Sequence, residues 1–267
     1  MKMHLSLDDF FQPLMELTDD RPASVFDQPE FAFLKKLHEE YGAVISCYCF
    51  LEDETGSRSL CEVPDCYREE FAANGDWLRF GFHARNKKVN YGSTLFHTED
   101  TCDDYEQAKA DYEHVIRELG RITGGGRCLD RMPRIHFYSG TETDCRAWME
   151  AQCGVLGLLS AEDQRLCYYH TEDQRRKLIQ EGILREEKLG LTFCRTDLRL
   201  ESEKDLEASI QTCVEQKQCR EKGQNELLVL FTHATLMKKE EILEKMRFCC
   251  KFARENEFVF AFPEELL

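Results

Sequence analysis

The chain opens with MKMHLSLDDF (residues 1–10), and the alternation in the middle of this stretch indicates how the fold is built. Successive side chains of a strand face opposite sides, so His4, Ser6 and Asp8 share one face and the intervening leucines share the other. We expect the leucines to pack outward against helices. The polar face would then line the interior of a barrel, with Asp8 at its mouth.

The rest of the chain alternates short apolar runs with helical patterns. The runs that read as strands cover residues 3–8, 43–50, 77–83, 134–140, 155–159, 165–170, 191–197 and 227–233, with FVFAF near the C-terminus as a further candidate. Apolar residues at helical spacing predict helices over 28–41, 65–74, 105–122 and 144–153. Such alternation predicts the α/β class. We expect a distorted (β/α) barrel of seven to eight mostly parallel strands, with residues 1–267 as a single domain.

Composition excludes several classes of function. The 267 residues include 51 acidic and 35 basic side chains, a formal charge of −16, which argues against nucleic-acid binding and against anionic membranes. No apolar run approaches the roughly 18 residues of a membrane span, and no signal peptide is recognisable. We therefore expect a cytoplasmic protein whose 14 cysteines are reduced thiols, most of them buried. The oligomeric state is not predicted.

Polar residues recur where the predicted strands end. Asp8 and Asp9 end the first run, His83 the third and His233 the last long one, and Asp163 follows residues 155–159. Functional groups of parallel barrels gather at the C-terminal ends of the strands. If regular pairing stops at Asp8, Asp9 can turn into the same mouth, so that two carboxylates share one site.

This set of residue types suits a metal-dependent hydrolase. A divalent metal binds Asp oxygen and neutral His nitrogen, a second carboxylate can accept a proton from water, and a histidine can protonate a leaving group. Strand parity over residues 134–140 places Arg134 and His136 on one face with Tyr138, so both are further candidates. Arg134 would either pair with a carboxylate such as Asp163 for structural reasons or orient the general base.

Three stretches in chain order resemble the motifs of the polysaccharide deacetylases, the NodB-type carbohydrate esterases. They are LSLDDF, RFGFHA and LLVLFTH, ending at or near Asp9, His83 and His233. The resemblance implies a distorted (β/α) barrel in which Asp8 is the general base and His233 the catalytic acid. It also implies that Asp9 and His83 are metal ligands. The expected metal is zinc, with cobalt or manganese as alternatives.

The sequence departs from the family pattern at one expected ligand. The second motif of the family has another histidine four residues after the first, where this chain has Lys87. His136 is the first candidate for the missing ligand, and His97 is the second.

The resemblance implies an enzyme that removes an acyl group, such as acetyl, from an amide on a sugar or a related polar substrate. The expected partner is therefore a saccharide or a small amide. Two alternatives remain: a degenerate barrel that binds carbohydrate or protein without turnover, and a barrel hydrolase acting on C–N bonds outside sugars.

Overall fold

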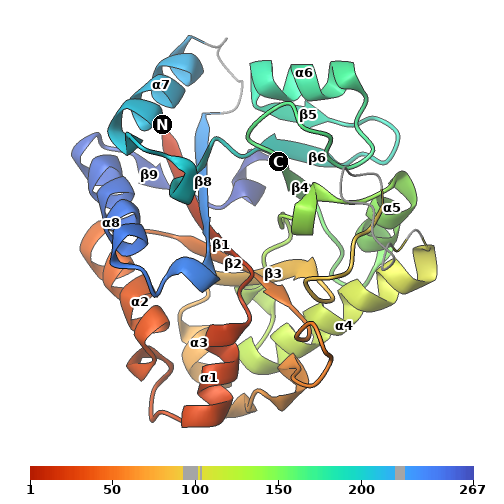
Figure 1. Ribbon diagram of the computed structural model, residues 1–267, viewed down its shortest axis with the longest axis vertical. Helices are drawn as coiled ribbons and strands as arrows, with labels where there is room; N and C mark the ends of the chain where they lie inside the picture. The colour runs from red at the N-terminus through yellow and green to blue at the C-terminus, as the bar shows by residue number, and fades with distance from the viewer. Residues whose placement is uncertain (93–101, 103, 220–225) are drawn as a thin grey trace.

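The computed structural model describes residues 1–92, 102, 104–219 and 226–267 (Figure 1). Its strands are β1 (Lys2–Asp8), β2 (Ile45–Phe50), β3 (Leu78–Ala84), β4 (Gly157–Ser160), β5 (Ile183–Arg185), β6 (Thr192–Arg195), β7 (Leu198–Arg199), β8 (Leu227–His233) and β9 (Val259–Phe260). Its α-helices are α1 (Gln12–Asp20), α2 (Pro29–Tyr41), α3 (Arg68–Ala73), α4 (Tyr105–Thr123), α5 (Glu142–Glu150), α6 (Glu172–Glu181), α7 (Leu206–Gln218) and α8 (Glu240–Glu255). Figure 1 shows the helices arranged around the outside of the strands.

Local sequence signals set the ends of the longest helix, α4. The Asp104 side chain accepts a hydrogen bond from the Gln107 backbone N–H, and Gly124 ends the helix at φ 90°. Both are favoured positions for these residue types, because a carboxylate satisfies a free N–H group and glycine tolerates positive φ. Of the helices in the described part of the chain, none has the length and apolarity needed to cross a bilayer.

The strands form two sheets. Parallel strands β3-β2-β1-β8-β7 lie in that order, with β9 beside the start of β1, and the smaller sheet has the order β4-β6-β5. Only β5 among these described strands runs antiparallel to its neighbour. The prediction of an α/β fold with a mostly parallel arrangement is therefore confirmed.

Backbone hydrogen bonds join the two sheets on one side through an irregular segment, residues 129–133. The Asp130 N–H donates to the Phe80 carbonyl of β3 at 2.8 Å, and the Leu159 N–H of β4 donates to the Pro133 carbonyl at 2.9 Å. The segment therefore lies between β3 and β4, in the position of a strand.

The chain between β6 and β7 joins the sheets on the other side. The Thr196 N–H donates to the Ser160 carbonyl of β4 at 3.0 Å, and the Asp197 N–H donates to the Val229 carbonyl of β8 at 2.8 Å. The hydrogen-bonded segments thus run around the molecule and form a distorted barrel. Strands β6 and β7 together occupy one strand position of this barrel.

Two apolar clusters lie on opposite faces of the barrel strands. The smaller one contains side chains from several strand positions, which are Tyr48, Met132, Leu159, Cys194, Leu227 and Val229. Leu5 and Leu7 belong to the larger cluster with the helices, whereas Ser6 and Asp8 bond Arg134. The predicted parity of the first strand is therefore correct: its leucines pack outward and its polar side chains face the interior.

Two predicted strands are absent from the structure. Residues 134–140 contain a 3-10 turn, His136–Tyr138, in which Phe137 and Tyr138 have φ of 58° and 54°. Residues 165–170 are irregular, with Tyr168 at φ 48°. Aromatic residues favour strands, but consecutive left-handed residues cannot continue a ladder. The strand parity inferred for residues 134–140 is wrong for the same reason.

The close pairing of β4 with β6 leads to a stability prediction. A Cβ on Gly157 would overlap the backbone carbonyl of Thr192, so Gly157→Ala should destabilise the fold by about 1–3 kcal/mol. Gly120→Ala is the control, because a Cβ there meets only Gly125 at 4.0 Å, and alanine favours a helix by up to about 1 kcal/mol. Urea unfolding measures both, and equal stability of the two variants would contradict the prediction.

Candidate active site

The two adjacent aspartates separate at the end of β1. Asp8 is in register with His233 of β8, so both strands end at the same level. Asp9 then adopts φ 55°, a left-handed conformation that aspartate tolerates better than most residues. The next residue is again paired with β2, since the Phe10 N–H donates to the Tyr48 carbonyl at 2.9 Å. This local turn brings both carboxylates to the same end of the barrel.

Asp9, His83 and His136 form a group of three potential metal ligands. One donor atom from each lies within 4.8 Å of the others. The His83 Nδ1 lies 2.6 Å from the Arg134 carbonyl oxygen, which can only accept, so Nδ1 carries the proton. In the neutral ring Nε2 then has a free lone pair, and it faces the Asp9 carboxylate at 3.3 Å.

His136 comes from the 3-10 turn that replaces the predicted strand. Its ring lies edge-on to Phe50, with centroids 5.2 Å apart, and 5.1 Å from the ring of His83. Burial, with the charge of His83 as a smaller cause, lowers the pKa of His136 to about 3. Its Nδ1 is buried and has no hydrogen-bond partner among the described residues. A neutral imidazole with a free nitrogen is suited to bind a metal.

The donor set fits a divalent metal. Zinc binds His nitrogen and carboxylate oxygen at about 2.0–2.2 Å, so two such ligands of a tetrahedral ion lie about 3.4 Å apart. The 3.3 Å between His83 Nε2 and Asp9 Oδ1 matches this spacing. Burial raises the pKa of Asp9, but the hydrogen bond and positive charge of His83 in its protonated form outweigh it and hold this pKa well below its usual range. Asp9 is therefore ionised, as a ligand must be.

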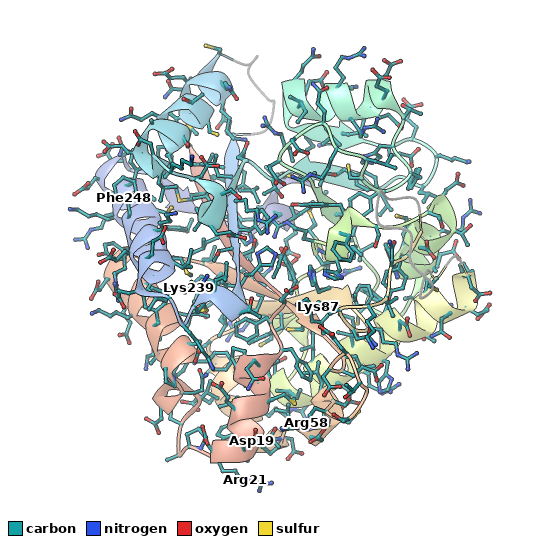
Figure 2. The ribbon with its side chains drawn as sticks, in the orientation of Figure 1. Asp19, Arg21, Arg58, Lys87, Lys239 and Phe248 are labelled. Carbon is teal, nitrogen blue, oxygen red and sulfur yellow. The ribbon has the colours of Figure 1, made fainter. Side chains whose placement is uncertain are left out.

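The other candidate ligands contribute less. Lys87, labelled in Figure 2, is exposed with its ammonium 3.9 Å from Glu54, and His97 lies outside the described residues. Cys61, His114 and Glu118 form a second group with metal-ligand spacing, but the Glu118 carboxylate is bonded by Arg121 at 2.8 Å. The first group is therefore the better candidate metal centre.

Asp8 is held by a buried guanidinium group. The Arg134 Nη1 donates to Asp8 Oδ1 at 2.7 Å and to Ser6 Oγ at 3.1 Å, and its other nitrogens reach Thr196 Oγ1. Burial lowers the pKa of Arg134, but the charge of Asp8 outweighs it and raises this pKa above its usual value. Arg134 therefore pairs with Asp8 rather than with Asp163, and it fixes the orientation of the Asp8 carboxylate.

His233 has its own carboxylate partner, which sequence reasoning missed. The His233 Nδ1 lies 2.5 Å from Glu201 Oε1, which also accepts from Arg199 Nε at 2.7 Å. Burial lowers the pKa of His233, but the hydrogen bond to Glu201 and the charges of Asp8 and Glu201 raise it above the ordinary value. Burial raises the pKa of Glu201, but the hydrogen bonds from His233 and Arg199 outweigh this effect and lower the pKa to about 2.

These groups meet at one cavity of about 180 Å³. Its lining includes most of the predicted site residues together with side chains the sequence did not single out; they are Asp8, His83, Arg134, Ile135, His136, Phe137, Tyr138, Arg165, Leu166, Arg199, Phe231 and His233. Asp9 joins the group through its contact with His83. Asp163 is exposed, accepts a hydrogen bond from Arg165 at 2.7 Å and does not line the cavity.

A sequence signal existed for Glu201. The run predicted over residues 191–197 is followed by a further short strand, β7, and Glu201 comes two residues after its end. It therefore follows the same rule of polar residues after strand ends that selected Asp8, His83 and His233.

Two solved structures have a fold similar to this one. A family 4 acetyl xylan esterase from Clostridium thermocellum, solved in complex with a cobalt ion, aligns with a TM-score of 0.50 and 9% identity over 100% of this chain and 90% of that chain. A T48 deacetylase solved with substrate aligns with a TM-score of 0.50 and 9% identity over 99% of this chain and 89% of the other. No family model and no curated protein matches the sequence. The resemblance to polysaccharide deacetylases is thus confirmed at the level of the fold.

Proposed function

We propose that this protein is a metal-dependent hydrolase that removes an acyl group, such as acetyl, from an amide on a sugar or a related polar substrate. One observation supports the proposal above all: a carboxylate with a guanidinium partner, a histidine with a carboxylate partner and three metal-ligand candidates converge on one cavity. Amide hydrolysis needs this combination of a proton acceptor, a proton donor and an activated water.

Asp9, His83 and His136 are the residues proposed to hold the metal. A divalent ion bound there would activate water for attack and stabilise the charge that develops on the amide oxygen. Asp8 would accept the proton of the attacking water, because Arg134 holds its carboxylate at the mouth in a fixed orientation. Arg134 is a positioning residue in this scheme.

His233 would deliver a proton to the departing amine. Glu201 favours the protonated imidazole by accepting from Nδ1, which leaves Nε2 as the proton donor toward the cavity. Asp8 and His233 lie opposite each other in register on neighbouring strands, so acceptor and donor flank the same space. His136 supplies a third ligand where Lys87 replaces the histidine of the family motif, which favours the enzyme over a barrel that only binds.

The proposal is tested by removing and restoring the metal. Protein stripped with a chelator should not release acetate from a panel of neutral and anionic N-acetylated saccharides, and added zinc, cobalt or manganese should restore release. Saccharide binding without acetate release under any of these metals would contradict the proposed hydrolase and favour the binding-only barrel.

The His233–Glu201 pair predicts a pH dependence. His233 must be protonated to act as the acid, so kcat should fall as the pH rises through the raised pKa of His233. Glu201→Gln removes the charge that stabilises the imidazolium, so this alkaline limb should move to lower pH. A pH profile of kcat measures the shift. Asp173→Asn, at an exposed carboxylate of α6 that pairs with Arg176, is the control that should leave the limb in place. An unchanged limb in Glu201→Gln would show that Glu201 does not set the pKa of the acid.

A further inference from the structure

The charges that line the cavity differ from those of the chain as a whole. The chain carries 51 acidic and 35 basic residues. Among the described residues, however, the cavity lining contains three arginines and one carboxylate. Asp8 is paired with Arg134, so the other charged side chains of the lining are Arg165, Arg199 and His233. The carboxylates that pair with them, Glu162, Asp163 and Glu201, are not part of the lining.

Carboxylates that are not part of the lining hold these two arginines in place. Arg165 bonds Asp163 through Nε at 2.7 Å and through Nη2 at 2.7 Å, and its Nη2 also reaches Glu162 at 2.8 Å. Arg199 bonds Glu201 through Nε at 2.7 Å. These contacts fix the guanidinium planes, which lowers the entropy lost when they bind a ligand.

Donors remain free on both arginines. No partner within the described ranges is bonded to Arg199 Nη1 or Nη2, or to Arg165 Nη1. A guanidinium group with two free nitrogens is matched to the paired oxygens of a carboxylate or phosphate. The Arg199 guanidinium also lies 5.9 Å from the Phe231 ring, another lining residue, so it is placed at the cavity wall.

We infer that the substrate carries an anionic group, a carboxylate or a phosphate, which Arg199 and Arg165 bind while the acyl amide faces Asp8 and His233. This inference rests on the proposed function for the amide, but the anion site itself can be tested without turnover. The chain has a formal charge of −16, so an anion must bind where guanidinium groups lie closer to it than carboxylates do.

Inert probes separate the anion site from catalysis, because they contain no amide. Glucose 6-phosphate, glucuronate and glucose are titrated into the metal-loaded protein by calorimetry, which compares phosphate, carboxylate and neutral sugar. At least one anionic probe should bind about tenfold or more tightly than glucose, and added salt should weaken its binding. Equal affinity of all three probes, or binding of none, would overturn the inference.

Variants assign the binding to the arginines. Arg199→Gln and Arg165→Gln should each weaken binding of the preferred anion by about tenfold or more, and Arg199→Lys should retain part of the affinity. Arg165→Gln is included because Arg165, unlike Arg199, does not contact Glu201. This variant therefore leaves the His233–Glu201 pair unchanged. Arg176→Gln is the control, since Arg176 is exposed on α6 and pairs with Glu172 and Asp173. Unchanged affinity in both cavity variants would contradict the assignment.

The two proposals fail in different ways. Tight anion binding without any acetate release would contradict the hydrolase and leave the anion site standing. Conversely, acetate release from N-acetylglucosamine as efficient as from its 6-phosphate and from N-acetylmuramic acid would support the hydrolase and contradict the anionic substrate.

Discussion

Asp8→Asn should lower the rate of acetate release by about 10²–10⁴-fold, the usual contribution of a general base. The asparagine oxygen can still accept the bond from Arg134 Nη1 that Asp8 Oδ1 accepts at 2.7 Å, so the local geometry should persist. Its amide cannot accept a proton from water, however. The loss should therefore appear in kcat at every pH.

Two controls separate this effect from misfolding and from metal loss. Metal content measured by mass spectrometry should equal that of the unaltered protein, because the metal-ligand candidates are Asp9, His83 and His136. Asp173→Asn should keep most of the activity, because Asp173 is exposed on α6 and pairs with Arg176. Full activity of Asp8→Asn with normal metal content would remove Asp8 from the mechanism.

Arg134→Met should have the largest effect on stability, a loss of about 3–5 kcal/mol in the free energy of unfolding. Arg134 is 1% exposed and Asp8 3% exposed, so the variant leaves a buried carboxylate without its counter-ion. The loss of the bonds to Ser6 and Thr196 adds to the cost. Urea unfolding monitored by circular dichroism measures the change.

The double variant Asp8→Leu/Arg134→Met distinguishes charge from packing. Replacing both members of a buried pair by apolar side chains is often close to neutral, so the double variant should be more stable than Arg134→Met alone. Arg176→Met, which breaks an exposed pair, should cost less than about 1 kcal/mol. A double variant at least as unstable as Arg134→Met would show that the charge pair is not the source of the loss.

The sequence was most informative where local and tertiary preferences coincide. The run at residues 227–233 forms β8 over Leu227–His233, and the first run forms β1 with its parity as expected. Both are parallel strands at the centre of the larger sheet, where apolar, β-branched and aromatic side chains satisfy the strand and the core together. Periodicity is a reliable guide under that condition.

The sequence was least informative where tertiary packing overrides the local conformational propensity of the residues. Residues 134–140 have a strand-like composition, yet Phe137 and Tyr138 adopt left-handed conformations that no propensity would favour. Arg134 and His136 still reach the cavity, although the strand parity that selected them does not exist. Strain of this kind is often found at functional sites, where surrounding contacts hold an unfavourable backbone.

Contacts between side chains that are far apart in the chain could also not be predicted from the sequence. Glu201 lies 32 residues before His233, and nothing in either local stretch specifies their contact. The buried Lys217–Asp197 pair, with an N···O distance of 3.0 Å, is a second case. Such contacts depend on how β7 and β8 and the helix between them are arranged, which only the folded chain determines.

An anomalous-difference map from crystals grown with zinc, recorded at the zinc absorption edge, tests the proposed metal centre most directly. One peak about 2.0–2.2 Å from a carboxylate oxygen of Asp9 and from one nitrogen each of His83 and His136 is expected. A map without a peak between these three side chains, at a zinc concentration that saturates binding in solution, would contradict the metal centre and with it the proposed hydrolase.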